Sequence, residues 1–313
     1  MVCIDPISTE SISRAIDLLR TGQLVAFPTE TVYGLGGDAT DNRAIAEIFA
    51  AKNRPDFNPL IVHVAHKAAA EKIGHFTKIA HALADQFWPG ALSLILRKTS
   101  NCTISALASA GLDSLAIRVP GHGFARSLIE QTGHPIAAPS ANASGRLSPT
   151  TAQHVADQLG DKIPLILDGG PCTIGVESTV LDLTKEAPTL LRPGGISVET
   201  IEQHLSIKIS TSAPRDGTFK SPGMLTSHYA PARPLRLNAH NVEPGEALLG
   251  FGPGGTGATL NLSESSNLTE AAANLFAYLH RLDAAPHQAI AVMPLPEEGL
   301  GRAINDRLRR AAA

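Results

Sequence analysis

The sequence predicts an α/β protein with a large domain, a linker and a small α/β domain. Up to about residue 198, short apolar runs alternate with stretches whose apolar residues recur at helical spacing, and this alternation resumes after residue 234. The length of 313 residues exceeds one typical domain, and 43% apolar with 18% charged residues can bury a substantial core. The mixture of elements leaves the order of the strands open.

The first elements follow from apolar spacing. Ile12, Ile16 and Leu19 predict a helix that stops at Gly22. The run LVAF, which ends at Pro28, predicts a buried strand, and a second helix is expected from about Asn42. Further strands are expected at residues 60–64, 92–96, 115–119, 164–167 and 178–183.

The composition changes in the last third of the chain. From about residue 208 to 234 it is rich in Ser, Thr, Pro and Gly and has no lasting periodicity, which predicts a linker. The strand EALLGF, a helix over Leu268–Leu282, the strand AIAVMP and a helix over Gly301–Arg310 then predict a Rossmann-like unit. The expected division is a large domain at 1–198, a linker at 199–234 and a small domain at 235–313.

The totals exclude several classes of protein. The formal charge of −3 gives no overall field that would attract nucleic acid or an anionic membrane. Cys3, Cys102 and Cys172 are odd in number and widely spaced, which argues against a disulfide framework and a zinc knuckle. No signal peptide is visible, and no apolar run approaches the roughly 20 residues of a membrane helix. We expect a soluble, cytoplasmic protein.

Two polar segments could bind an anion. Residues Pro28–Gly37, PTETVYGLGG, follow a strand with hydroxyls, a glutamate and glycines that let backbone N–H groups approach a ligand; a glycine-rich turn explains them equally well. In KNRPDFNPL, Lys52 and Arg54 stand beside two prolines, and rigidly placed cations suit phosphate oxygens. The alternative is a pair of solvated cations at a helix C-terminus.

Polar residues also occur within apolar strands and turns. Arg118 in LAIRVP needs an anionic partner, either a structural carboxylate or a ligand. His63 in LIVHV is more typical of a hydrogen-bonded core residue than of a ligand contact. In APSANASG, Ser140, Asn142 and Ser144 could grip a ligand, although a polar turn before a helix cap is as good an explanation.

The remaining motifs narrow the chemistry. Ser178 in ESTV and Arg192 in LRPGG are, taken singly, typical of turns. GFGPGG lacks the following helix of a dinucleotide fingerprint, and the spacing of His63 and His66 points them to opposite faces of a strand, so neither indicates a site. Cations, hydroxyls and amides without a nucleophile–base pair favour nucleotidyl or phosphoryl transfer.

The motifs PTETVYGLG, KNRP, PLIVHV, IRVP, PSAN, ESTV and LRPGG, in this order, resemble the YrdC-like domain of threonylcarbamoyl-AMP synthases over about residues 8–198. SPGM…HYAP and the terminal GLGRAINDRLRRAA resemble the long form with an extra C-terminal domain. The resemblance implies a twisted mixed sheet with helices around a large, positively lined cavity. It also implies that L-threonine, bicarbonate and ATP give threonylcarbamoyl-AMP and pyrophosphate. The product would serve adenosine modification next to the anticodon, so tRNA and the tRNA-threonylcarbamoyl transferase machinery are implied partners.

The resemblance further implies roles for individual residues. Arg118 would pair with the threonine carboxylate. Lys52, Arg54 and Arg192 would be the catalytic cations that neutralise the triphosphate, and Mg²⁺ would arrive with ATP. The residues expected to contact threonine are Thr31, His63, Arg118, Ser140 and Ser178. Those expected to line the ATP site are Lys52, Arg54, Asn58, Ser114, Asn142, Thr150, Arg192 and, from the linker, Tyr229.

The linker is expected to act as a lid. It carries Pro222, Gly223, His228, Tyr229 and Pro231, which a plain flexible spacer would not need. As a hypothesis, it closes over the cavity and shields a carbamate that water would decompose.

Two other functions compete with synthesis of the adenylate. One is a non-catalytic YrdC-like module that binds RNA, which the near-neutral charge and the 4% aromatic content count against. The other is carbamoyl transfer of the hydrogenase-maturation type, whose members carry cysteine zinc fingers that three scattered cysteines cannot supply.

Overall fold

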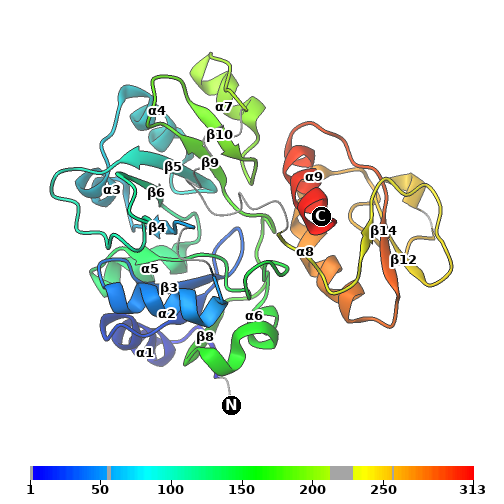
Figure 1. Ribbon diagram of the computed structural model, residues 1–313, viewed down its shortest axis with the longest axis horizontal. Helices are drawn as coiled ribbons and strands as arrows, with labels where there is room; N and C mark the ends of the chain where they lie inside the picture. The colour runs from blue at the N-terminus through cyan, green and yellow to red at the C-terminus, as the bar shows by residue number, and fades with distance from the viewer. Residues whose placement is uncertain (1–2, 55–57, 212–227, 256) are drawn as a thin grey trace.

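The computed structural model describes residues 3–54, 58–211, 228–255 and 257–313, which form a large and a small α/β part (Figure 1). The large part contains a ten-stranded mixed sheet and the small part a four-stranded parallel sheet. These architectures confirm the predicted fold class. No helix in the described ranges is long and apolar enough to cross a lipid bilayer.

The large sheet joins strands that are far apart in the sequence. Its order is β1-β8-β2-β3-β7-β4-β6-β5-β9-β10. At its centre β4 runs parallel to β6, with His63 opposite Arg118, and antiparallel to β7. The strands are β1 Ile4–Pro6, β2 Val25–Phe27, β3 Gly34–Asp38, β4 Ile61–His63, β5 Leu92–Arg97, β6 Ser114–Arg118, β7 Ile136–Ala137, β8 Leu165–Asp168, β9 Thr179–Asp182 and β10 Thr189–Arg192. The glycine-rich β3 and the two-residue β7 escaped prediction because neither contains a long apolar run.

Polar side chains set the ends of the helices in the large part. Asp41 caps α2 by accepting from the Arg43 N–H, and Asn53 ends it in the left-handed conformation, at φ 50°. The chain therefore turns directly after Lys52, whose ammonium reaches back to the carbonyl of Ser140. The helices here are α1 Thr9–Arg20, α2 Asn42–Lys52, α3 Lys67–Ile73, α4 Lys78–Phe87, α5 Gly123–Thr132, α6 Ala152–Leu159 and α7 Val198–Leu205.

The small part has the predicted Rossmann-like character. Its strands are β11 Leu235–Arg236, β12 Glu246–Gly250, β13 Leu260–Asn261 and β14 Ala289–Val292, all parallel in the order β11-β14-β12-β13. Its α-helices are α8 Leu268–Ala284 and α9 Leu300–Ala311. The GFGPGG segment contains a short 3₁₀ turn at Pro253–Gly255, and the next described element is the strand β13 rather than a helix.

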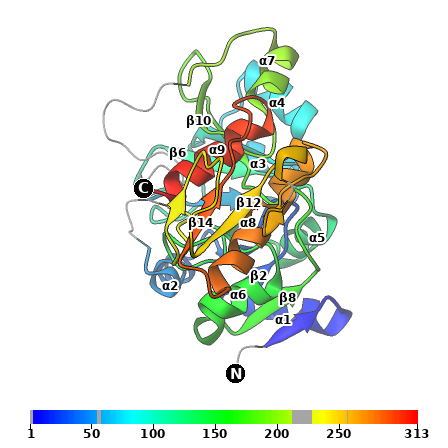
Figure 2. The same cartoon turned by 90° about the vertical axis from the view of Figure 1, so that its right-hand side faces the viewer.

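The two parts share one apolar cluster. Val32, Leu147 and Val176 of the large part are buried in it together with Leu275 and Phe276 of α8. Figures 1 and 2 show α8 and α9 lying between the small sheet and the large part. The small part is therefore packed against its neighbour through apolar contacts.

A helix occupies the start of the predicted linker. Residues 198–205 form α7, whose buried Val198 and Ile201 belong to the core of the large part together with Ile209. His204 also approaches the Ala82 carbonyl at 3.2 Å. This helix was not predicted, because it has few apolar residues at helical spacing and a polar stretch follows it. Residues 212–227, the centre of the predicted linker with Pro222 and Gly223, lie outside the described residues.

A pair of histidines joins the two parts. His154 of α6 stacks on His280 of α8 with ring centroids 3.9 Å apart. Burial and the neighbouring His280 lower the pKa of His154 to about 4, and burial lowers that of His280. Asp157, Asp283 and Arg146 also influence one or other ring. Both rings are therefore neutral in the packed structure at pH 7.

Acidification is expected to weaken this packing. Because both folded-state pKa values lie below the ordinary value of about 6.5, the contribution of the pair is complete above that pH and is lost as pH falls toward 4. The unfolding midpoint should fall between pH 7 and pH 5 by a few degrees more in the wild type than in His280→Gln. The exposed His240 provides the control variant His240→Gln. Equal pH slopes in all three proteins would contradict the expectation.

Candidate active site

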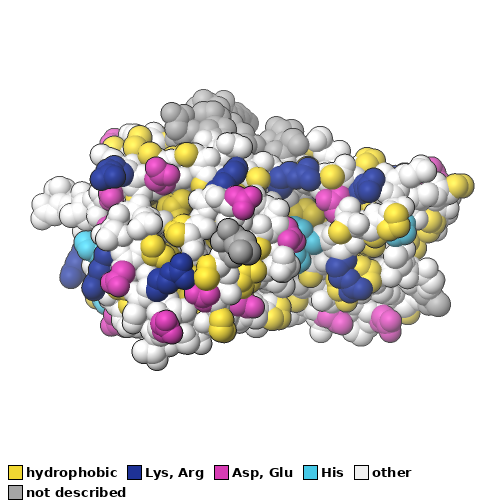
Figure 3. All heavy atoms as spheres, turned by 90° about the horizontal axis from the view of Figure 1, so that it is seen from below, with side chains coloured by type: hydrophobic (Ala, Val, Ile, Leu, Met, Phe, Trp, Pro, Cys, Tyr) yellow, Lys and Arg dark blue, Asp and Glu magenta, His cyan; other side chains and the backbone are white. Residues whose placement is uncertain are grey.

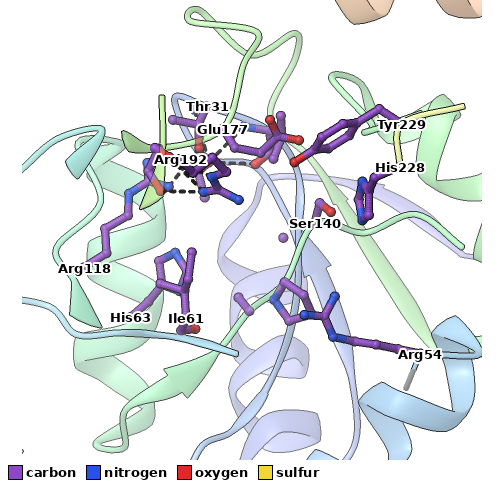
Figure 4. Close-up of a pocket in the computed structure, with 16 residues that line it drawn as sticks. Thr31, Arg54, Ile61, His63, Arg118, Ser140, Glu177, Arg192, His228 and Tyr229 are labelled. Atoms are coloured by element: carbon purple, nitrogen blue, oxygen red, sulfur yellow. Dashed lines mark hydrogen bonds between the residues drawn. The ribbon is translucent and has the colours of Figure 1, made fainter. Parts of the chain in front are cut away.

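A cavity opens where the central strands of the large sheet meet the end of the predicted linker (Figure 4). It encloses about 520 Å³ of space between atoms, part of it open to solvent. Cationic and hydroxyl side chains and one carboxylate share its wall with apolar groups, as suits a polar anionic ligand. The lining residues are Thr29, Thr31, Val32, Gly34, Arg54, Ile61, His63, Arg118, Ala138, Pro139, Ser140, Glu177, Ser178, Arg192, His228 and Tyr229.

All five residues predicted to contact threonine line this cavity. Thr31 follows β2, His63 and Arg118 end the adjacent strands β4 and β6, Ser140 follows β7, and Ser178 precedes β9. The five come from segments separated by as much as 147 positions in the sequence. Only the order of the sheet brings them together.

Two of these side chains already have protein partners. Arg118 donates to Glu30 at 2.5 Å, to the Thr31 hydroxyl at 2.9 Å and to the Gly90 carbonyl at 3.0 Å. A structural carboxylate therefore satisfies Arg118, one of the two possibilities left open by the sequence, while the guanidinium still lines the cavity. The Nδ1 atom of His63 lies 3.2 Å from the Ile61 carbonyl, and burial with the charge of Arg118 lowers the pKa of His63 to about 3. His63 is therefore neutral.

Three of the residues predicted for ATP also line the cavity. Arg54 donates to the carbonyls of Asn58 and Pro59, and burial lowers its pKa to about 10. Arg192 donates through Nε and Nη2 to the Ser178 carbonyl, and burial lowers its pKa as well. Tyr229, at 1% exposure, lies across the cavity from Arg118 and His63 in Figure 4. Buried guanidinium groups whose charged forms are disfavoured would gain from a bound anion.

Lys52 lies directly behind the wall. Its ammonium donates to the Ser140 and Asn142 carbonyls, and within the described ranges it forms no ion pair with a carboxylate. Burial and the charge of Arg54 hold the pKa of Lys52 well below its ordinary value. The Lys52 side chain therefore fixes the PSAN turn beside the cavity, with no carboxylate partner in the described part of the chain.

The other predicted ATP residues do not line this cavity. Asn58 and Asn142 are each 1% exposed, and their Oδ1 atoms have no hydrogen-bond partner in the described structure. Thr150 is buried and donates its N–H to His154. Ser114 lies at the opposite end of β6 from Arg118, beside Arg97 of β5.

Sequence reasoning missed two acidic residues at the site. Glu30 holds Arg118 and accepts the His122 N–H, and Glu177 lines the cavity. His228, which the sequence placed in the lid, also lines it and packs edge-on against Tyr229 at 4.1 Å. The sequence could have indicated both residues, because Glu30 lies within the motif PTET and Glu177 within the motif ESTV.

Comparison with known proteins covers both parts of the chain. The family model described as "Telomere recombination", which unites Sua5, YciO and YrdC proteins, matches residues 17–194. The model described as "Threonylcarbamoyl-AMP synthase, C-terminal domain" matches residues 196–313. Together the two models span nearly the whole sequence.

Individual relatives agree with these models. The threonylcarbamoyl-AMP synthase of Pyrococcus abyssi is 41% identical over 95% of this chain and 93% of its own length, and that of Bacillus subtilis is 41% identical over 98% and 95%. The crystal structure of P. abyssi Sua5 complexed with L-threonine superposes with a TM-score of 0.88 at 40% identity, covering 100% of this chain and 97% of that one. With both of its parts matched, this chain belongs to the threonylcarbamoyl-AMP synthase family, in the long form that carries a C-terminal domain.

Proposed function

We propose that this protein catalyses the reaction of L-threonine, bicarbonate and ATP to L-threonylcarbamoyladenylate and pyrophosphate. The proposal rests on one observation in a chain of this family. Three buried arginines, Arg54, Arg118 and Arg192, surround one hydroxyl-rich cavity. Such a wall can bind a carboxylate and a triphosphate at the same time.

The chemistry requires no covalent bond to the enzyme. The threonine amine adds to the carbon of bicarbonate, and loss of water leaves an N-linked carbamate. A carbamate oxygen then attacks the α-phosphorus of ATP, while the bond to the β-phosphate oxygen breaks and pyrophosphate leaves. Because the carbamate is itself the nucleophile, the enzyme contributes positioning and charge neutralisation.

The threonine site would be formed by Thr31, His63, Arg118, Ser140 and Ser178. Their hydroxyls and the Arg118 guanidinium face one space, which supports a common role in holding a small amino acid. In this arrangement Glu30 would fix Arg118, so that the guanidinium meets the threonine carboxylate without reorientation.

The ATP site would use Lys52, Arg54 and Arg192 against the phosphates. The Oδ1 atoms of Asn58 and Asn142, which have no hydrogen-bond partner among the described residues, support a ligand that brings hydrogen-bond donors, such as the adenine amino group or the ribose hydroxyls. Thr150 and Tyr229 would complete the site, and Ser114 stays a prediction without a supporting contact.

Magnesium and bicarbonate would enter as substrate partners. In the described part of the chain, no group of three or more His, Cys, Asp or Glu side chains could hold a metal ion. Mg²⁺ would thus be bound mainly by the phosphates of ATP, as is common for this ion.

The lid hypothesis also stays a proposal. His228 and Tyr229 line the cavity from the linker, which supports closure by this segment, and residues 228–234 would connect the lid to the small domain. The division into a large domain at 1–198, a linker at 199–234 and a small domain at 235–313 likewise stays a proposal, in which α7 packs on the core of the large domain.

The decisive test is pyrophosphate release from ATP and bicarbonate with and without L-threonine, with mass detection of the adenylate. Threonine-dependent release with the adenylate peak is the expected result. Silence in the folded protein, with salt-dependent binding of tRNA, would favour the RNA-binding alternative. On the face shown in Figure 3, basic and acidic side chains are interspersed, which is unlike a nucleic-acid surface. If the protein does synthesise the adenylate, the tRNA-modifying machinery would use this product.

The replacement Arg118→Ala is expected to raise the KM for threonine about 10- to 100-fold, because a charge-assisted bond of about 1.5–3 kcal/mol is lost. The change also leaves Glu30 without its guanidinium partner, so Glu30→Gln/Arg118→Met is the matched variant. The same rise in the double variant indicates contact with threonine. Recovery of the wild-type KM in the double variant would show that Arg118 only balances Glu30.

A further inference from the structure

One arginine of the last helix reaches the wall of the cavity. Arg307 of α9 is 0% exposed, and its Nε donates to Glu177 Oε2 at 2.7 Å. Its Nη1 donates to the Pro193 carbonyl at 2.8 Å and to Asp306 at 2.8 Å. The guanidinium carbon lies 5.3 Å from the centre of the Tyr229 ring. A single side chain of the small part thus contacts the ESTV motif, the LRPGG turn and the end of the linker.

Glu177 is an unusual neighbour for a triphosphate. Burial would raise the pKa of Glu177, but the charges of Arg307 and Arg192 outweigh burial and lower it to about 2. The carboxylate is therefore ionised while it lines a cavity proposed to bind ATP. Figure 4 shows Glu177 close to Arg192, one of the proposed phosphate-binding cations.

The hydrogen bonds that Glu177 accepts come from groups other than this cation. One carboxylate oxygen accepts from Arg307 and the other from the Ser148 hydroxyl at 2.5 Å. Arg192 correspondingly donates to the carbonyl and the hydroxyl of Ser178. Without Arg307, the buried Glu177 carboxylate would form an ion pair with Arg192 or would repel the phosphates of ATP.

We infer that Arg307 is a positioning residue for the nucleotide site: it holds and neutralises Glu177, so that Arg192 faces the phosphates of ATP. The inference rests on the proposed function and extends it by making α9 of the small domain part of the active site. The cation–π contact of the Arg307 guanidinium with Tyr229 brings the end of the linker into the same arrangement.

The test compares Arg307→Met, Glu177→Gln/Arg307→Met and the control Arg309→Ala with the wild type. Arg309 lies on the same helix but forms an exposed ion pair with Glu297, away from the cavity. ATP affinity is measured by calorimetric titration between pH 5.5 and 8.5, together with the KM values for ATP and threonine. A thermal melt checks that each variant is folded.

Arg307→Met should weaken ATP binding about 10- to 100-fold, as expected when one member of a buried charge pair is removed. The loss should grow with pH, because Glu177 without Arg307 has a higher pKa and repels ATP only when ionised. Glu177→Gln/Arg307→Met should recover most of the affinity and lose this pH dependence. The KM for threonine should change less than the KM for ATP, and Arg309→Ala should match the wild type.

A purely structural role for Arg307 predicts a different pattern. ATP affinity in the double variant would then be as low as in Arg307→Met, at every pH, and that result overturns the inference. If Arg307→Met does not fold, the double variant decides alone: ATP affinity within about tenfold of the wild type, the value of one charge-assisted hydrogen bond, supports the inference, and a larger loss overturns it. Threonine-dependent turnover by the wild type tests the proposed function separately, so either idea can fail without the other.

Discussion

Replacement of Arg192 by methionine is expected to lower kcat/KM for ATP by about 10²- to 10³-fold, the usual cost of removing a group aimed at charge in the transition state. Arg192 is 3% exposed at the end of β10, and its bonds to Ser178 fix the guanidinium at the cavity wall. Methionine retains much of the side-chain volume but removes the charge and all donors. We expect the loss to appear in kcat as well as in KM, since charge develops on the leaving pyrophosphate.

The control for this variant is Arg97→Met. Arg97 ends β5, is exposed and donates to the Thr184 carbonyl rather than into the cavity. Steady-state kinetics with saturating threonine and bicarbonate provide the measurement. If Arg192→Met retains wild-type kcat/KM while the melt shows a folded protein, Arg192 does not act on the phosphates.

Replacement of Lys52 by methionine is expected to cost a comparable factor of about 10²–10³ in kcat/KM for ATP, because a buried charge and its hydrogen bonds are lost together. The Lys52 ammonium donates to the carbonyls of Ser140 and Asn142, so its loss should also loosen the turn that carries the proposed threonine contact Ser140. Both the KM for ATP and the KM for threonine should therefore rise.

The pH dependence of ATP binding shows whether Lys52 acts through its charge or only through its structural hydrogen bonds. In the free protein the pKa of Lys52 is held well below its ordinary value by burial and by Arg54, and a bound triphosphate would raise it. ATP binding should therefore be strongest below the free-protein pKa and weaken as pH rises through it, with proton uptake on binding. Lys52→Met should lose this dependence.

Lys98→Met is the matched control, since the Lys98 ammonium donates to the Ser109 hydroxyl and does not line the cavity. Calorimetry in two buffers of different ionisation enthalpy measures the proton uptake. Equal uptake by the wild type and Lys52→Met would exclude Lys52 as the group that titrates.

Local sequence patterns predicted much of the large sheet. The apolar runs at 92–96 and 115–119 correspond to β5 and β6. Such strands can be predicted locally, because a short run of apolar residues is visible without knowledge of the neighbouring strands. The boundary at 198 stays a prediction. Helix α7 presents few apolar residues before a polar stretch, so its packing on the core of the large part could not be read from local sequence.

The motifs also indicated the family and the residues that meet at the cavity. Thr31, His63, Arg118, Ser140 and Ser178 were predicted as one site and do line one space. Their assigned roles remain predictions that the kinetic experiments above would test.

Sequence alone determined the α/β class, the anion-binding character of the motifs and the membership of the family, because these depend on residue types and their spacing along the chain. Tertiary structure alone decided the partners of the charged side chains. The pairing of Arg118 with Glu30 spans 88 positions, and that of Glu177 with Arg307 spans 130. No local pattern encodes such pairs, since the choice of a buried charge partner is fixed only when the sheet order and the docking of the small domain bring the two groups into a common low-dielectric space.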